Sequence, residues 1–285
     1  MRYYHVDVFS PKPLGGNGLT AVFPDEPLSD GAMLEITREF KQFETIFLYP
    51  RLADGAFPAR IFTVDEELLF AGHPAIGAGA VLHELFFPDA AETGLTLALG
   101  ERRVRLHSRK DAGGRRVAMN QGKPSFLQTV DASQRGPVAR AVGVREEDID
   151  PAYPLEVVST GLPYLLAPLR GGLADSGVAE ADFEAFLAGY GAKFVYLFDT
   201  ATLECRTWDN IARTEDAATG SAAGPLCAYL IRHGMKKRSE DITLSQGKFV
   251  GRPSVIRGRV ENGDGGDEVF ITGDVAFFAS GVIDL

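Results

Sequence analysis

Segment 214–230 carries residue types suited to binding an anion or a developing negative charge. It begins with two carboxylates, Glu215 and Asp216, continues through small residues to Gly224, and ends in an apolar run that can form a helix. The first backbone N–H groups of such a helix have no partner within it, and the helix dipole makes this end positive. The free N–H groups and the positive helix end together predict a site for a carboxylate or an oxyanion, with Asp216 at its mouth and Ser221 inside it.

A similar segment lies earlier in the chain. Arg60 and Arg206 each belong to an Arg-x-aromatic strand, small-residue turns begin at Ala71 and Ala217, and both pairs are 146 residues apart. An internal repeat of this kind changes the expected fold, because it predicts two similar units. Each unit would supply one helix N-terminus, so a substrate could lie between them. The same pattern also fits helices whose small residues only allow close packing against a sheet.

Two side chains outside segment 214–230 could take part in acid–base chemistry. Glu44 follows Phe43, between an expected helix and an expected strand, and a carboxylate among apolar neighbours suits a general acid or base. His73 precedes Pro74 in the turn of the first repeat, where it could donate a proton or bind a substrate carboxylate. The residues alone also fit a solvated loop Glu44 and a His73 that caps a helix.

Composition is that of a soluble globular protein. The 285 residues are 45% hydrophobic and 24% charged, and no run approaches the roughly 20 apolar residues of a membrane span. The formal net charge of −10 argues against nucleic acid and an anionic membrane as partners, but local N–H groups still allow an acidic substrate. The N-terminus reads as a strand and lacks the features of a signal peptide, so we expect a cytoplasmic protein.

No sequence pattern indicates a metal or a cofactor. Cys205 and Cys227 form no C-x-x-C pair, and the five histidines form no ligand-spaced cluster. Neither a GxGxxG after a strand nor a GxxxxGK[ST] is present. We therefore expect no metal, flavin, nicotinamide or pyridoxal phosphate, and we expect both cysteines to be buried apolar residues.

Periodicity locates the elements that must position these residues. Helices over 75–85 and 221–231 are apolar on most faces, so we expect them to be the buried centres of the two units. Ser29 is expected to cap a third helix. Near the C-terminus, 268–272 and 276–278 read as two separate strands.

A change of composition at 120–124 marks the expected junction between the units. It predicts an N-terminal domain over 1–120 and a C-terminal domain over 121–285, with the last strand free to return to the first domain. The sequence has no flexible linker and no low-complexity tail, which favours two halves packed as one unit.

These features together resemble the PhzF family of phenazine-biosynthesis isomerases, whose fold is shared with diaminopimelate epimerase. The resemblance is carried by Val6-Asp-Val-Phe, Gly16-Asn, Phe43-Glu-Thr-Ile-Phe-Leu, Arg60-Ile-Phe-Thr, Ala71-Gly-His-Pro-Ala-Ile-Gly, Glu215-Asp-Ala-Ala-Thr-Gly-Ser-Ala, Gln246-Gly and Gly251-Arg-Pro-Ser. The Gly-His-Pro and Glu-Asp-x-Ala-Thr-Gly-Ser segments, in this order and spacing, are specific to the family. The resemblance implies an α+β fold of two similar domains, each a mixed β-sheet or barrel curled around a central α-helix, with a cleft between them.

The resemblance also implies an isomerase that needs no metal or cofactor. Such an enzyme moves a proton within a small carboxylate-bearing substrate, either cyclic or amino-acid-like. The family's catalytic residues correspond to Glu44, His73, Asp216 and Ser221, and the predicted substrate-binding set is Asn17, Gly72, Pro74, Thr219 and Gly220. We expect Glu44 to move the proton, the two helix N-termini to hold the anion, and all these residues to converge on one cleft. A homodimer is left open.

Two departures from the family pattern bear on substrate identity rather than chemistry. Ala217 stands where the family often has Pro, and Gly18 stands where it often has Pro or Ser. Both changes loosen a turn. Racemising relatives use a thiol in each Gly-rich turn, and neither turn here contains Cys, which favours a proton shuttle with one carboxylate. The sequence leaves two alternatives: a racemase or epimerase with Glu44 and Asp216 as opposed bases, and a non-catalytic binding or scaffold protein of the same fold.

Overall fold

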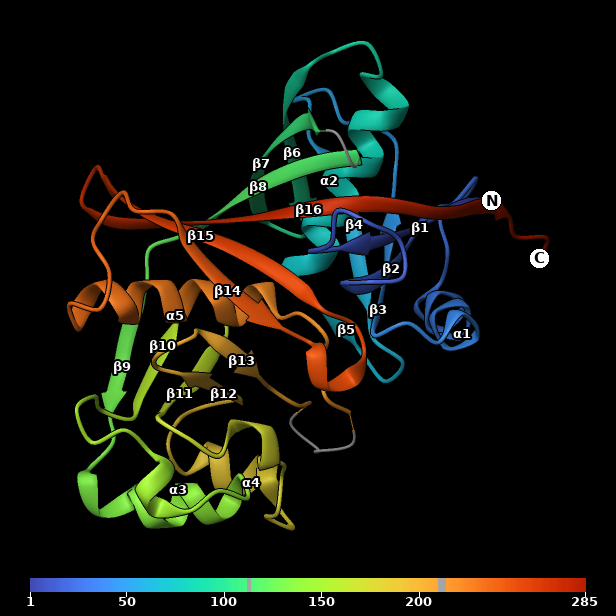
Figure 1. The fold of residues 1–285 in the computed structure, drawn as a ribbon. Helices are drawn as coiled ribbons and strands as arrows, with labels where there is room; N and C mark the ends of the chain where they lie inside the picture. The colour runs from blue at the N-terminus through green and yellow to red at the C-terminus, as the bar shows by residue number, and fades with distance from the viewer. Residues whose placement is uncertain (112–113, 210–213) are drawn as a thin grey trace. The chain divides into compact units, whose positions relative to one another are not determined.

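The chain divides into two compact units by its internal contacts. The computed structural model describes residues 1–111, 114–209 and 214–285. Unit 1 consists of residues 1–120 and 271–285, and unit 2 consists of residues 121–270. In Figure 1 the red C-terminal strand β16 runs beside the blue N-terminal strand β1, and the two pair antiparallel. The C-terminal segment therefore belongs to unit 1.

Unit 1 is a closed barrel with strand order β1-β2-β3-β4-β6-β7-β8-β16, and the pairing of β16 with β1 completes the circle. The β2–β3 and β4–β6 pairs are parallel, whereas the β1–β2, β3–β4, β6–β7, β7–β8 and β1–β16 pairs are antiparallel. The short β5 pairs with β4. The strands are β1 (Arg2–Val8), β2 (Asn17–Phe23), β3 (Glu44–Leu48), β4 (Phe57–Phe62), β5 (Glu67–Leu68), β6 (Glu92–Leu99), β7 (Arg102–Asp111), β8 (Gly114–Gly122) and β16 (Gly266–Val282), which belongs to this unit from residue 271 onward.

Helix α2 (Gly72–Phe86) fills the barrel, and its side chains are buried over nearly its whole length. Two glycines allow this close fit. A Cβ at Gly77 would lie 2.4 Å from Leu19 Cδ2 in β2, and a Cβ at Gly79 would lie 2.9 Å from Val117 Cγ1 in β8. The small residues therefore bring two sides of the helix against the barrel wall, and the predicted buried central helix of the first half is confirmed.

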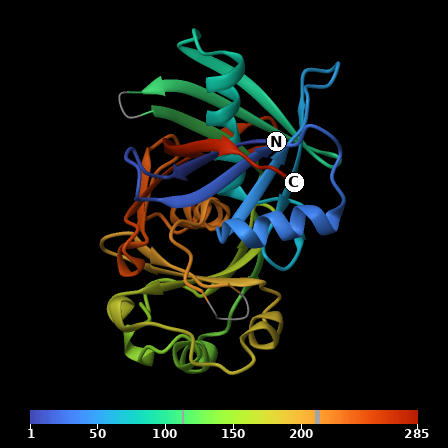
Figure 2. The same cartoon turned by 90° about the vertical axis from the view of Figure 1, so that its right-hand side faces the viewer.

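Helix α1 (Asp30–Phe40) lies on the outside of the barrel, across β3 and β4 (Figure 2). Ser29 caps it as predicted, because its hydroxyl accepts a hydrogen bond from the N–H of Ala32 at 3.2 Å. Met33 on the inner face of the helix packs with Val22 and Phe47 of the strands. This apolar cluster fixes the helix on the barrel surface.

Strand β16 corrects one prediction, because it runs unbroken through the two segments expected as separate strands. Gly273 lies between those two segments. A Cβ at this position would meet Phe9 Cδ1 at 2.6 Å, so the glycine makes room for an aromatic ring and the strand continues. Beyond β16, the Met1 amino group donates to the Ile283 carbonyl at 3.1 Å, and the termini lie close together (Figure 2).

Unit 2 is a sheet with strand order β15-β14-β13-β12-β11-β10-β9, with α5 on one face and α3 and α4 on the other (Figure 1). Its strands are β9 (Ser125–Thr129), β10 (Glu156–Ser159), β11 (Pro163–Leu169), β12 (Phe194–Asp199), β13 (Glu204–Arg206), β14 (Ile242–Gln246) and β15 (Ser254–Gly263). Its helices are α3 (Arg135–Ala141), α4 (Phe183–Ala188) and α5 (Gly220–Arg232).

Alternation along the central strands divides the core of unit 2 into two layers. Leu165 and Leu197 belong to the apolar cluster that contains residues of α3 and α4. Tyr164 and Phe198, one position away on the same strands, contact Ser221 and Tyr229 of α5. Helix α5 is buried from its first residue to Leu230, which confirms the second predicted central helix.

Candidate active site

Strand pairing places three predicted site residues of unit 1 at the same end of the barrel. Strands β2 and β3 are parallel, so their first residues, Asn17 and Glu44, lie at the same end of the barrel. Helix α2 also begins there, with His73 in its first turn. His73 Nε2 lies 3.2 Å from Glu44 Oε2, and Asn17 Nδ2 lies 3.4 Å from His73 Nδ1. All three side chains are buried.

The hydrogen-bonding direction of His73 follows from its neighbours and its burial. Burial lowers the pKa of His73 to about 3, so the imidazole is neutral near pH 7. The Asn17 amide donates to Nδ1, which assigns the proton to Nε2 on the side of Glu44. The 3.2 Å contact between Nε2 and the Glu44 carboxylate is close enough for an ion pair but lies outside hydrogen-bond alignment. We interpret it as a polar contact between a neutral donor and a carboxylate.

The N-terminus of α2 has no side-chain cap. The residue before the helix, Ala71, offers no acceptor to the first turn. The amides of Gly72 and His73 have no acceptor within the helix, and Pro74, in the third position, has no N–H to satisfy. The interpretation of His73 as a helix cap is therefore wrong, and its ring points to Asn17 and Glu44 instead.

In unit 2 the loop before α5 folds back on the carboxylate of Asp216. The Thr219 hydroxyl donates to Asp216 Oδ2 at 2.5 Å, and the Ala218 amide donates to Oδ1 at 3.3 Å. Helix α5 has no side-chain cap, and the hydroxyl of its N-cap residue Thr219 points to Asp216 instead. The amides of Gly220 and Ser221, in the first turn, have no acceptor within the helix.

The hydroxyl of Ser221 is held by a tyrosine of the neighbouring sheet. Ser221 Oγ lies 2.7 Å from the Tyr164 phenolic oxygen, and both groups are buried. The ring of Tyr164 stacks on Phe194, with 5.3 Å between centroids, which fixes the phenol. Sequence reasoning missed Tyr164, because nothing in its local sequence distinguishes it from other strand residues.

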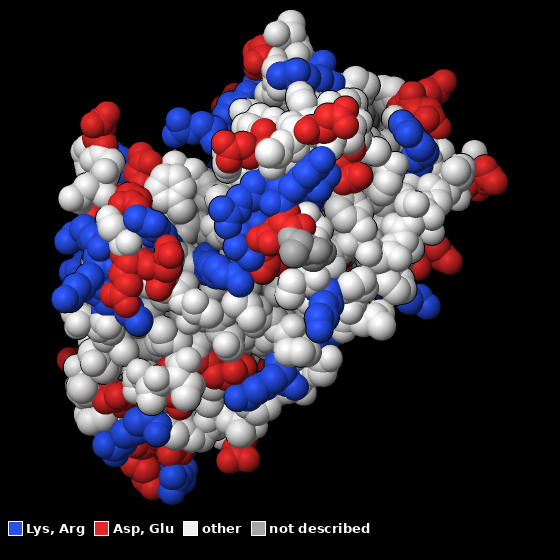
Figure 3. Space-filling view, turned by 45° about the horizontal axis from the view of Figure 1, so that its top comes forward, with Lys and Arg blue, Asp and Glu red and all other residues white. Residues whose placement is uncertain are grey.

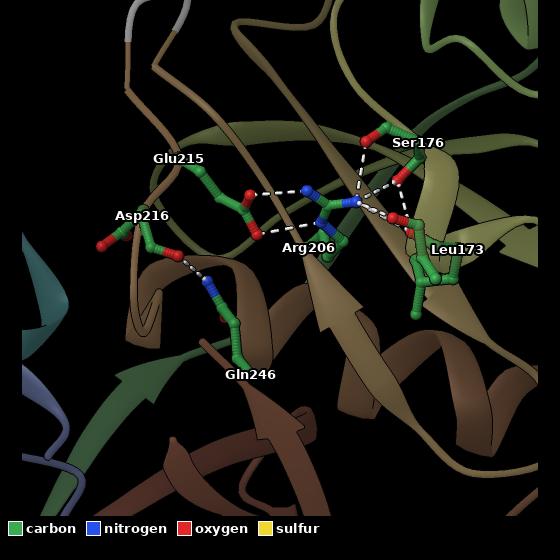
Figure 4. A network of polar contacts seen from close by, with 7 residues as sticks. Leu173, Ser176, Arg206, Glu215, Asp216 and Gln246 are labelled. Atoms are coloured by element: carbon green, nitrogen blue, oxygen red, sulfur yellow. Dashed lines mark hydrogen bonds and ion pairs between the residues drawn. The ribbon is translucent and has the colours of Figure 1, made fainter. Parts of the chain in front are cut away.

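An arginine anchors the Asp216 loop through the residue before it (Figure 4). Arg206 binds Glu215 by two parallel hydrogen bonds, from Nε at 2.9 Å and from Nη2 at 2.6 Å. Its Nη1 donates to the carbonyls of Leu173 at 2.9 Å and Ser176 at 2.7 Å. The guanidinium also lies over the Trp208 ring, 4.9 Å from its centroid. Arg206 thus ties the loop to a separate turn of the same unit.

Unit 1 contains the counterpart of this arrangement, as the internal repeat predicts. Arg60 binds Glu67 through two hydrogen bonds, and its guanidinium lies 5.1 Å from the Phe62 ring centroid. Phe62 is the β-partner of Glu67, and Trp208, 146 residues later, is the β-partner of Glu215. In both units the Arg–Glu pair lies in the segment that leads to a central helix.

The structure therefore brings the predicted residues together in two groups. Asn17, Glu44, Gly72, His73 and Pro74 lie at one end of the barrel of unit 1. Asp216, Thr219, Gly220 and Ser221 lie at the start of α5 in unit 2. Their convergence on a single cleft stays a prediction.

Neither the charges on the face shown in Figure 3 nor the ligand groups of the described residues indicate a different kind of site. Figure 3 shows basic and acidic side chains next to each other on the face displayed, without a field of one sign. Within residues 1–111, 114–209 and 214–285, no three His, Cys, Asp or Glu side chains are placed to hold a metal ion. In that same part of the chain, no helix is long and apolar enough to cross a membrane.

Comparison with known proteins relates this arrangement to one family. The family model described as phenazine biosynthesis-like protein matches residues 6–281. The trans-2,3-dihydro-3-hydroxyanthranilate isomerase of Pseudomonas chlororaphis is 32% identical over 299 residues, covering 100% of this chain and 99% of its own length.

Two solved structures share the fold along the whole chain. A predicted epimerase from Pseudomonas aeruginosa superposes with a TM-score of 0.92 at 43% identity, covering 99% of this chain and 98% of its own. A PhzF-family phenazine biosynthesis protein from Bacillus anthracis superposes with a TM-score of 0.88 at 18% identity, covering 100% and 99%. The predicted α+β fold is confirmed, and the isomerase relatives favour catalysis over a scaffold role.

Proposed function

The chain belongs to the PhzF family of isomerases, and we propose that it moves one proton between two carbons of a small cyclic amino acid, with Glu44 as the acid–base group. One observation carries this proposal: the buried Glu44 carboxylate lies against a neutral His73 at the uncapped N-terminus of α2. A base and a set of anion-stabilising N–H groups are the two parts that carbon deprotonation needs.

Glu44 performs both proton transfers in this mechanism. Its carboxylate removes an acidic C–H proton, and the electron pair of that bond enters the conjugated system of the substrate. The same carboxyl group then returns the proton to another carbon as the double bond shifts. Atoms and electrons balance without a metal, a cofactor or a co-reactant. A protonated His73 would hold the carboxylate more tightly and weaken it as a base, so the neutral ring supports this role.

The helix N-termini hold the substrate carboxylate and the delocalised anion. The amides of Gly72 and His73 in unit 1, and those of Gly220 and Ser221 in unit 2, are the proposed donors. The contact with Tyr164 supports a fixed position for the Ser221 hydroxyl.

Asp216 is assigned to binding a polar substituent of the substrate, such as an amino group. Its carboxylate already accepts hydrogen bonds from Thr219 and Ala218, which favours an orienting role over that of a second mobile base. A racemase with Glu44 and Asp216 as opposed bases is the second candidate, because the 43%-identical structure is described as a predicted epimerase.

Trans-2,3-dihydro-3-hydroxyanthranilate, the compound in the name of the Pseudomonas chlororaphis relative, is the first probe substrate. Incubation with the protein in deuterated water, followed by NMR, is expected to give a product with a displaced double bond. Treatment with a metal chelator should leave the rate unchanged. Deuterium at the original carbon with inverted configuration and no shift of the double bond would support the racemase instead. No reaction with this probe or with a panel of cyclic amino acids would refute the proposal.

A further inference from the structure

Gln246, at the end of β14, lies at the centre of the Asp216 loop. Its Nε2 donates to the Asp216 carbonyl at 2.8 Å and to Thr219 Oγ1 at 2.9 Å. Its Oε1 accepts from the Thr219 amide at 3.1 Å and from the Tyr196 hydroxyl at 2.9 Å. The residue is 1% exposed, so its carboxamide donates two hydrogen bonds and accepts two away from water.

These bonds determine the orientation of the amide and of the next hydroxyl. The Asp216 carbonyl can only accept and the Thr219 amide can only donate, so nitrogen and oxygen of Gln246 cannot be exchanged. Thr219 Oγ1 accepts one proton from Gln246, so its own proton is directed to Asp216 Oδ2. The chain of hydrogen bonds therefore runs in one direction, from Gln246 through Thr219 to the Asp216 carboxylate.

The residue after Gln246 contacts the same loop through its backbone. Gly247 has a φ of +84°, and a Cβ there would lie 2.4 Å from the Ala217 carbonyl oxygen and 2.3 Å from that of Arg252. Any side chain would push the loop away. Gln246 thus contacts the loop through its carboxamide, and Gly247 contacts it through backbone atoms that no side chain covers.

We propose that Gln246 is a positioning residue for the reaction, which holds the Asp216 carboxylate in one orientation by setting the direction of the Thr219 hydroxyl. This inference rests on the proposed role of Asp216 in binding the substrate. Gln246 contacts the loop that carries Asp216, so it acts on the carboxylate through Thr219.

The substitution Gln246→Glu tests the direction of this chain with little change of shape. An ionised Glu can only accept, so it competes with Asp216 for the proton of Thr219 and faces the Asp216 carbonyl without a donor. A protonated Glu donates again. We expect kcat/KM for the probe substrate to fall about ten- to a hundredfold. The ratio of variant to wild-type activity should rise as the pH is lowered.

Gln121→Glu is the matched control. Gln121 is also buried beside the start of α5, but it donates to the Gly220 carbonyl at 2.8 Å and accepts from Thr160 at 2.9 Å. Both variants should lower the melting temperature to a similar extent, while Gln121→Glu should lose much less activity. Equal losses of activity would mean that any buried Glu beside this helix is harmful, which would overturn the proposal.

A double-mutant cycle with Asp216→Asn separates the inference from the proposed function. If Gln246 acts through Asp216, the effect of Gln246→Glu should shrink in the Asp216→Asn background, whereas additive effects would overturn the inference. Full activity of Asp216→Asn alone would refute the assigned role of Asp216. A measurement without substrate is the exchange rate of the two Gln246 carboxamide protons by ¹⁵N NMR. Both should be protected in the wild type, and one in rapid exchange would contradict the hydrogen-bond chain.

Discussion

The two Arg–Glu pairs of the internal repeat allow a prediction with a built-in control. Glu215→Gln and Glu67→Gln make the same change at corresponding places in the two units. The Arg206 and Glu215 side chains are both 9% exposed, whereas those of Arg60 and Glu67 are 31% and 37% exposed. Removing one partner from a buried pair leaves a desolvated charge, whereas water screens the charge left by an exposed pair.

The expected costs follow from these exposures. Glu215→Gln should lower the free energy of unfolding by about 3 kcal/mol, near the lower end for a broken buried pair because carbonyls also bind Arg206. Glu67→Gln should cost at most about 1 kcal/mol. For a unit of this size, these values correspond to losses of roughly 6–12 °C and of less than about 4 °C in melting temperature.

Thermal unfolding followed by circular dichroism measures both variants. The single tryptophan, Trp208, lies beside the Arg206 guanidinium, so its fluorescence gives a local signal for unit 2. Its emission should change in native Glu215→Gln and stay unchanged in native Glu67→Gln. Equal and small losses of stability in both variants would refute the assignment of Arg206 as the buried anchor of the Asp216 loop.

Three further predictions concern the helices and the buried ionisable groups. Gly77→Ala should cost on the order of 1–3 kcal/mol, because its methyl group would press on Leu19; Gly94→Ala, with open space around it, should cost less, and denaturant titration of both variants checks this. Because burial lowers the pKa of His73 from 6.5 to about 3, its NMR signals should not titrate between about pH 5 and 8. As the pH falls, the imidazole of the unfolded chain binds a proton near pH 6.5, but that of the folded protein binds one only near pH 3. The stability that comes from a neutral His73 is therefore complete above pH 6.5 and is lost as the pH falls toward 3. A His73 ring that titrates near pH 6.5 in the folded protein would contradict this. Burial raises the pKa of Cys227 to about 12 and also that of the second cysteine, so a thiol reagent should label neither until the protein unfolds.

Much of the fold could be predicted because its central helices have an unusual composition. Small and apolar residues on most faces indicate a helix with neighbours all around it, and both predicted helices are buried. The unbroken strand β16, where two strands were expected, shows where sequence reasoning fails. A glycine in a strand fits either a break or a close approach, and only the position of the Phe9 ring distinguishes the two.

The site was predictable where its residues belong to one motif and less so where distant segments meet. Asn17 and Glu44 lie at the same end of the barrel because β2 and β3 are parallel, and local periodicity does not reveal that pairing. Gln246 is 27 and 30 residues from its partners Thr219 and Asp216, so its hydrogen bonds have no local signature. The Gln246-Gly motif was recognised by resemblance, but its physical purpose follows only from the structure.

The central claim is that Glu44 transfers the proton, and Glu44→Gln tests it most directly. The amide keeps the size of the side chain and removes the base. Glu35→Gln, at an exposed position of α1, is the control for an ordinary change of charge. We expect turnover of the probe substrate to fall by a factor on the order of a hundred or more in Glu44→Gln alone, at an unchanged melting temperature. Wild-type turnover by a folded Glu44→Gln protein would contradict the account.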